Sequence, residues 1–151
     1  MANSYIQIWL HCVFSTKNRK PFLDSLELRE RVFAYLASTA RGMGCILPVV
    51  GGVEHHTHLI FGLSKILSIS EFVKELKRNS SGWVKSISPS LSNFSWQKGY
   101  GAFSVSHSAK KKVIQYIQNQ EAHHHKQDFR DEYIQLLDLH GVEYDERYLF
   151  D

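Results

Sequence analysis

The stretch VEHHTHLIF, residues 53–61, alternates in a way that predicts a β-strand with two different faces. Side chains project alternately to opposite sides of a strand, so His56 and His58 lie on the same face. The opposite face is mostly apolar and is expected to pack on the core; it carries Val53, His55, Thr57, Leu59 and Phe61. The histidine pair is therefore expected to point away from this core or into a cleft, where two imidazoles can bind one metal ion.

The segments on either side of this strand predict the order β-α-β-β-α-β. Strands are expected in four ranges: 5–15, 46–53, 55–63 and part of the aromatic stretch 94–106. Helices with apolar residues at helical spacing are expected at 25–41 and 70–87. This order is typical of the ferredoxin-like, or split βαβ, fold, an α+β architecture with an antiparallel sheet and helices on one face. Additional C-terminal helices are expected at 108–125 and 128–139, before an extended, docked tail at 142–151.

The bulk composition fits one globular domain over residues 1–151, because 43% of the residues are apolar. No run of about 18 apolar residues is present to span a membrane, and the start does not resemble a signal peptide. Cys12 and Cys45 are the only cysteines, which excludes a disulfide framework and a cysteine-based zinc motif. A cytoplasmic, reduced protein is expected.

Tyr116 and Gln120 supply a possible reaction for a metal at the histidine pair. Two histidines leave a site incomplete for structural zinc, which normally takes four protein ligands, whereas an open site with oxygen ligands suits a catalytic ion. Gln120 offers such an oxygen, and Tyr116, four residues earlier, is expected on the same helix face. A nearby cation favours the phenolate of tyrosine, whose pKa in water is about 10. This pattern predicts attack of a tyrosine on a phosphodiester. Exposed histidines without a metal, and a tyrosine packed as an ordinary aromatic, remain alternatives.

Five segments together resemble the single-tyrosine transposases of bacterial insertion sequences, the IS200-like members of the HUH nuclease superfamily. The segments are HCVFSTK at 11–17, GGVEHHTHL at 51–59, WQKGYGAFSVS at 96–106, YIQNQE at 116–121 and EYDERY at 143–148. They extend over essentially the whole chain. One position departs from the family pattern, because the residue between the two histidines is usually apolar and here it is Thr57.

The resemblance implies a DNA transposase with His56, His58 and Gln120 as metal ligands and Tyr116 as the nucleophile. It implies magnesium or manganese as the metal, and cleavage and rejoining of single-stranded DNA through a 5′-phosphotyrosine intermediate. Hairpins at the ends of the mobile element would be the recognition target, and the protein would act as a homodimer. In relatives the tyrosine helix can complete the partner's active site, so assembly within one chain or across two chains is left open.

Basic side chains on one predicted helix and one loop are the candidate DNA-binding residues. They are Lys74, Lys77, Arg78 and Lys85 on the helix, and Lys17, Arg19 and Lys20 in the loop. Solvated helix ends and turns explain each basic cluster equally well. Two other functions are compatible with these residues: a noncatalytic or domesticated nucleic-acid-binding module of the same fold, and a metal hydrolase of small phosphoesters.

Overall fold

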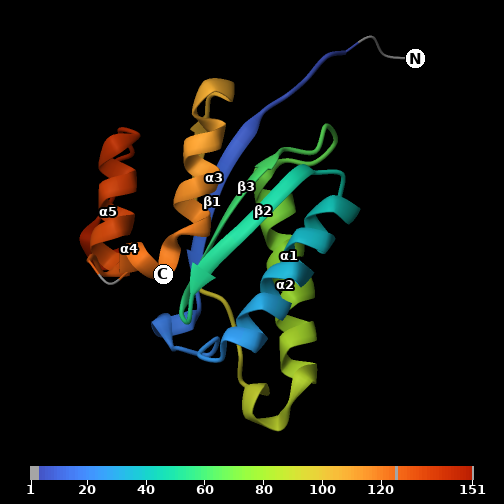
Figure 1. The fold of residues 1–151 in the computed structure, drawn as a ribbon, viewed down its shortest axis with the longest axis vertical. Helices are drawn as coiled ribbons and strands as arrows, with labels where there is room; N and C mark the ends of the chain where they lie inside the picture. The colour runs from blue at the N-terminus through green and yellow to red at the C-terminus, as the bar shows by residue number, and fades with distance from the viewer. Residues whose placement is uncertain (1–3, 125, 151) are drawn as a thin grey trace.

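A four-stranded antiparallel sheet forms the centre of the computed structural model, which describes residues 4–124 and 126–150 (Figure 1). The strands are β1 (Trp9–Ser15), β2 (Ile46–Val53), β3 (His56–Gly62) and β4 (Gly101–Val105). Their spatial order is β2-β3-β1-β4, with β3 and β1 in the centre. This order and the intervening helices confirm the predicted ferredoxin-like fold.

Two helices, α1 (Leu26–Gly42) and α2 (Ile69–Ile87), cover one face of the sheet (Figure 1). Each begins at a serine, Ser25 or Ser68, whose side chain accepts a hydrogen bond from a backbone N–H in the first turn. Leu59 and Phe61 of β3 pack in this core, and the Phe61 ring lies 4.6 Å from that of Phe72. The predicted apolar face of the histidine strand is therefore confirmed for these residues.

The C-terminal helices α3 (Lys110–Gln118), α4 (Gln120–His124) and α5 (Phe129–Leu139) lie on the other side of the sheet (Figure 1). Ile60 of β3 packs with Ile117 of α3, and Val13 of β1 packs with Phe129 of α5. Every residue of β3 is consequently buried. The histidine face does not look into solvent; it lies between the sheet and a second layer of helices.

Several predicted boundaries are wrong. The first strand begins at Trp9 instead of residue 5, because pairing with both β3 and β4 begins at Trp9. Most of the stretch 94–100 is irregular and contributes only a bridge between Thr16 and Trp96. The helix predicted at 108–125 is divided at Asn119, whose φ and ψ of −104° and 23° end α3.

The C-terminal tail is docked as predicted but is not extended throughout, because residues 146–148 form a 3-10 turn. Tyr144, Leu149 and Phe150 pack against the cluster that contains Phe129 and Tyr133. Residue 151 lies outside the described residues. Within the described part of the chain, no helix has the length and apolarity needed to cross a membrane.

Gly51 sets the distance between β2 and α3. A Cβ at this position would collide with the backbone carbonyl of Ile117, which lies in α3 one residue after Tyr116. Glycine is therefore required here for close approach of the helix to the sheet.

We predict that Gly51→Ala lowers the free energy of unfolding by about 1–3 kcal/mol, because the added methyl group overpacks the contact with α3. Gly82→Ala is the matched control: Gly82 lies in α2 with open space around it, so alanine should raise stability by about 0.5–1 kcal/mol. Urea denaturation of both variants measures the effects. A Gly51→Ala protein as stable as the wild type would contradict this account of the packing.

Candidate metal and tyrosine site

The β2–β3 hairpin positions both histidines of the site. Val53 pairs with His56 across a two-residue turn, and His58 lies between Gly51 of β2 and Val13 of β1 in the register. His55 belongs to this turn and not to the strand, so the expectation that it faces the main core is wrong. Its ring lies 5.0 Å from that of His56 and 6.1 Å from that of Phe129. Thr57 points to the opposite face and donates a hydrogen bond to the Gly51 carbonyl.

A buried glutamate, Glu132 of α5, joins the histidine pair. Its Oε1 lies 3.3 Å from the Nε2 atoms of both His56 and His58. One ligand atom from each of these three residues falls within 4.8 Å of the others. Gln120 adds an amide oxygen, 3.1 Å from His56 Nε2, and its nitrogen donates to Glu132 Oε2.

This donor set fits a divalent cation. Two imidazole nitrogens and a carboxylate oxygen form a two-histidine, one-carboxylate arrangement, which leaves positions for substrate or water. The side chains of His56 and His58 are fully buried, so their present neighbours already hold the rings in place. His56 also stacks on Phe129 at a centroid distance of 4.0 Å. Among the residues predicted as ligands, the structure thus brings His56, His58 and Gln120 together.

Sequence reasoning missed Glu132. Acidic residues in a first helical turn usually complement the helix dipole, and Glu132 occupies that position in α5. One signal was present: Glu132 falls on the same helix stripe as the apolar residues Phe129, Tyr133 and Leu137, all of which are buried. A carboxylate within an apolar stripe needs a partner in the interior.

Tyr116 reaches the same carboxylate from α3. Its hydroxyl donates a short hydrogen bond to Glu132 Oε2 within the same chain. Because α3 ends at Gln118 and α4 begins at Gln120, Tyr116 and Gln120 lie on two successive helices and not on one helical face, which corrects the prediction. Burial and the negative charge of Glu132 raise the pKa of Tyr116 well above its usual range. Glu132 therefore holds Tyr116 in its protonated form.

His11 of β1 forms the outer support of His58. His11 Nε2 and His58 Nδ1 lie 2.8 Å apart, and His11 is almost completely buried. Two proton arrangements satisfy this contact. In the first, His58 carries its proton on Nε2 and donates it to Glu132, while His11 Nε2–H donates to His58 Nδ1. In the second, His58 carries its proton on Nδ1 and donates it to His11 Nε2, so that His58 Nε2 can offer its lone pair to a cation. His11 thus keeps the His58 ring oriented in both states.

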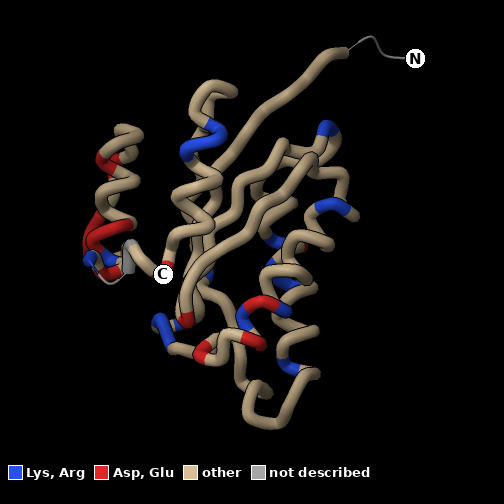
Figure 2. Tube along the Cα trace, in the orientation of Figure 1, with Lys and Arg blue, Asp and Glu red and all other residues tan. Residues whose placement is uncertain are grey.

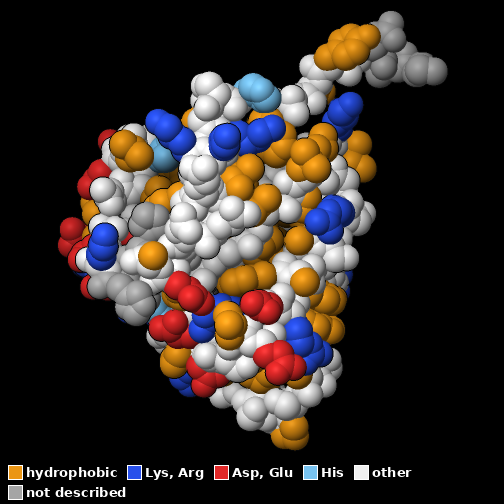
Figure 3. All heavy atoms as spheres, viewed as in Figure 1, with side chains coloured by type: hydrophobic (Ala, Val, Ile, Leu, Met, Phe, Trp, Pro, Cys, Tyr) orange, Lys and Arg blue, Asp and Glu red, His pale blue; other side chains and the backbone are white. Residues whose placement is uncertain are grey.

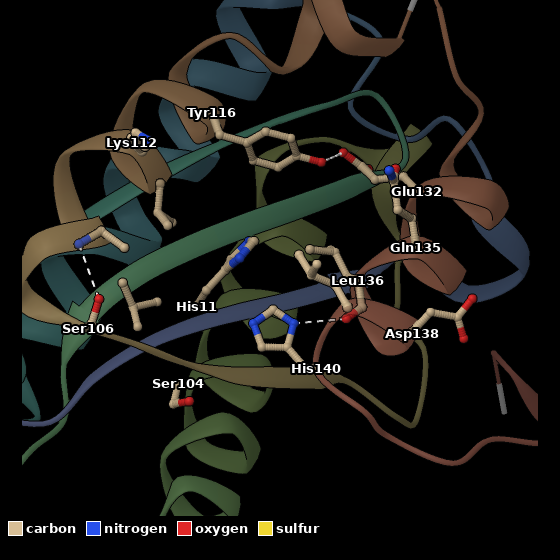
Figure 4. Close-up of a pocket in the computed structure, with 14 residues that line it drawn as sticks. His11, Ser104, Ser106, Lys112, Tyr116, Glu132, Gln135, Leu136, Asp138 and His140 are labelled. Atoms are coloured by element: carbon tan, nitrogen blue, oxygen red, sulfur yellow. Dashed lines mark hydrogen bonds between the residues drawn. The ribbon is translucent and has the colours of Figure 1, made fainter.

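A cavity of about 850 Å³ opens beside this site, between α3, α5 and the end of β4 (Figure 4). Tyr116, Glu132 and His11 form its inner wall. Tyr116 and Glu132 therefore face the buried histidines on the side of the sheet and adjoin open space on the side of the cavity.

The predicted DNA-binding residues do not lie in this cavity. Lys74, Arg78 and Lys85 are exposed on α2, and Lys17, Arg19 and Lys20 are exposed after β1. Figure 2 shows Lys and Arg positions on elements of both helical layers. Arg78 pairs with Glu75 at 2.7 Å, and the Arg19 guanidinium lies 4.0 Å from the Phe150 ring centroid.

Lys77 differs from the other predicted DNA-binding residues because its ammonium group is already satisfied. It donates to the carbonyls of residues 97, 98 and 99, at 2.9, 3.3 and 2.7 Å. It also lies 4.9 Å from the Phe14 ring centroid, and burial lowers its pKa to about 8. Lys77 thus supports the loop before β4, and we do not retain it as a phosphate contact.

We predict that His11→Phe weakens Mn²⁺ binding by roughly 10- to 100-fold, because supports of metal ligands commonly contribute that much affinity. His107→Phe, an exposed histidine outside the site, is the control and should bind like the wild type. Electron paramagnetic resonance of free Mn²⁺ measures both affinities. Equal affinities for the two variants would show that His11 has no role in orienting His58.

A second prediction concerns the stability of the metal-free protein in acid. Burial, with help from neighbouring His58, lowers the pKa of His11 to about 3. Between pH 6.5 and 3 the unfolded chain therefore binds a proton that the folded chain does not, so stability falls as the pH falls. His11→Phe should reduce this slope by up to about 1.4 kcal/mol per pH unit, whereas His107→Phe should keep it. Urea denaturation in EDTA across this range measures the slopes, and identical slopes would contradict the assignment.

Comparisons with known proteins show the family and the fold. Residues 4–120 match the family model described as "Transposase IS200 like". A proposed transposase from Deinococcus radiodurans R1 is 25% identical, with a TM-score of 0.62 over 80% of this chain and 95% of that one. A REP-associated tyrosine transposase bound to a REP hairpin shares the fold, with a TM-score of 0.58 and 16% identity over 82% of this chain and 73% of that one. No curated protein matches the sequence. The chain belongs to the IS200-like transposase family.

Proposed function

We propose that this transposase cleaves and rejoins single-stranded DNA with Tyr116 as its nucleophile. The observation that carries the proposal is the shared contact of Glu132 with both histidines and with the Tyr116 hydroxyl. A tyrosine one hydrogen bond from a candidate metal ligand supports a role in attack on a phosphate that the same site would hold. His56, His58 and Glu132 would hold the cation, with Gln120 as a further oxygen ligand.

In the proposed reaction the Tyr116 oxygen forms a bond to phosphorus as the bond from phosphorus to the 3′-oxygen breaks. The Tyr116 proton is released to water, so that Glu132 stays ionised as a ligand, and the leaving 3′-oxygen takes up a proton from water to become a free hydroxyl. The protein keeps the 5′-phosphate as a phosphotyrosine, which a second 3′-hydroxyl attacks to rejoin DNA. A bound magnesium or manganese ion would offset the charge of Glu132 and polarise the phosphate. The contact between His11 and His58 would keep the His58 ring oriented during this step.

The substrate and the assembly are also part of the proposal. Single-stranded DNA with hairpin ends is the substrate that the family resemblance implies, and one structural neighbour was solved with a REP hairpin. Excision of a segment with two ends needs two tyrosines, which a homodimer would supply. The exposed residues Lys17, Arg19, Lys20, Lys74, Arg78 and Lys85 are proposed as phosphate contacts.

Tyr116→Phe should abolish a covalent protein–DNA adduct, because phenylalanine has no hydroxyl to attack phosphorus. Tyr148→Phe, which alters an exposed tyrosine in the tail, should form adducts like the wild type. The measurement is a denaturing gel after incubation with Mn²⁺ and labelled single-stranded DNA that carries the element ends. An adduct with Tyr116→Phe would refute the nucleophile. No adduct with wild type would favour a noncatalytic DNA-binding module.

The exposed lysines should control the salt dependence of DNA binding. Lys74→Ala and Lys85→Ala should each lower the slope of log affinity against log salt by about 1, because each removes one phosphate contact. Lys77→Met should leave the slope unchanged and lower the stability, because its ammonium binds backbone carbonyls. Fluorescence anisotropy at several salt concentrations measures the slopes. If only Lys77→Met reduced the slope, Lys77 would be the phosphate contact and Lys74 and Lys85 would not, which would contradict our assignment.

A further inference from the structure

The cavity beside Tyr116 has walls of two kinds. α3 and the residue before it contribute Ala109, Lys112, Val113 and Tyr116, whereas α5 and the residue after it contribute Glu132, Leu136, Asp138, Leu139 and His140. Figure 4 shows Lys112 on the α3 side, Asp138 on the α5 side, and His11 and His140 between them. The lining is therefore apolar in the middle, cationic at one side and anionic at the other.

Lys112 lies one helical turn before Tyr116, and both side chains face the cavity. Residues four apart on a helix have Cβ atoms roughly 5–6 Å apart. A DNA strand whose phosphate meets Tyr116 would thus bring a neighbouring phosphate within reach of Lys112. Figure 3 shows that basic side chains gather over the end of the molecule where α3 begins, which favours entry of a polyanion from this side.

The α5 side of the cavity suits a base better than a phosphate. Asp138 repels phosphates, but its carboxylate can accept hydrogen bonds from the amino groups of bases. His140 offers an aromatic ring, which is held by its Nδ1 contact to the Leu136 carbonyl at 2.8 Å and by stacking on Phe103 at 4.5 Å. Leu139 is 76% exposed at the rim, although it is a large apolar side chain. A fixed ring with apolar neighbours is a stacking platform for an unpaired base.

From this arrangement we propose that the cavity binds the unpaired nucleoside next to the phosphate that Tyr116 attacks. Its base lies against His140 and Leu139, and the adjoining phosphate binds Lys112. This inference rests on the proposed function, because it takes Tyr116 as the attacking group. The cavity would then determine which nucleotide is accepted beside the cleavage position.

Nuclear magnetic resonance with mononucleotides tests the site without knowledge of the element ends. We expect dAMP, dCMP, dGMP or TMP to shift the methyl signals of Val113, Leu136 and Leu139 and the ring signals of His140 in metal-free protein. Inorganic phosphate should shift only signals near Lys112. Shifts from phosphate alone, shifts at other surfaces, or no shifts at all would overturn the proposal.

Two neighbouring lysines provide a matched pair of variants. Lys112→Gln should weaken the mononucleotide shifts and reduce adduct formation roughly tenfold, whereas Lys111→Gln, which removes the same charge outside the cavity lining, should not. His140→Ala should remove the stacking and weaken binding by roughly tenfold or more. If the wild type forms adducts but these variants match it, the cavity proposal fails and the proposed function stands. If the wild type forms no adduct, the proposed function itself fails.

Discussion

The carboxylate of Glu132 is the group on which the rest of the site depends. It is almost fully buried, and it contacts His56, His58, Gln120 and the Tyr116 hydroxyl. A buried charge is tolerated only when hydrogen-bonding partners replace the lost water, and here those partners come from three different elements. The nearby histidines hold the pKa of Glu132 well below its usual range. The same contacts that stabilise the charge therefore bring the ligand pair and the tyrosine together.

The fold makes this convergence possible by burying both faces of the sheet. α1 and α2 cover one face with an aliphatic and aromatic core, and the C-terminal helices cover the other face around the histidines. Gly51 lets α3 approach β2 closely enough for Tyr116 to reach the site. The family match covers residues 4–120 and so includes Tyr116 and Gln120, whereas Glu132 lies beyond it on α5. In this chain the carboxylate of the candidate site comes from a helix outside the matched region.

Local patterns in the sequence predicted most of the fold. Alternation around His56 and His58 assigned them to one face, and the order of elements predicted the ferredoxin-like sheet. Long-range contacts could not be predicted in this way. Glu132 resembles an ordinary acidic residue of a first helical turn until α5 is placed over the histidines. Lys77 resembles its exposed neighbours until the loop at 97–99 is seen to surround its ammonium group. The helix break at Asn119 also has no strong local signal, since neither glycine nor proline occurs there.

The proposal with the most direct test is that one chain supplies both the ligands and the tyrosine of its candidate site, as the contact between Tyr116 and Glu132 of the same chain predicts. Co-expression of Tyr116→Phe with a differently sized His58→Ala variant tests it, because each variant lacks one half of the site. Assembly within one chain predicts no covalent DNA adduct from the mixed protein, while wild type of either size forms one. An adduct on the His58→Ala chain that appears only in the mixture would show that the site is shared between subunits, and would contradict the claim.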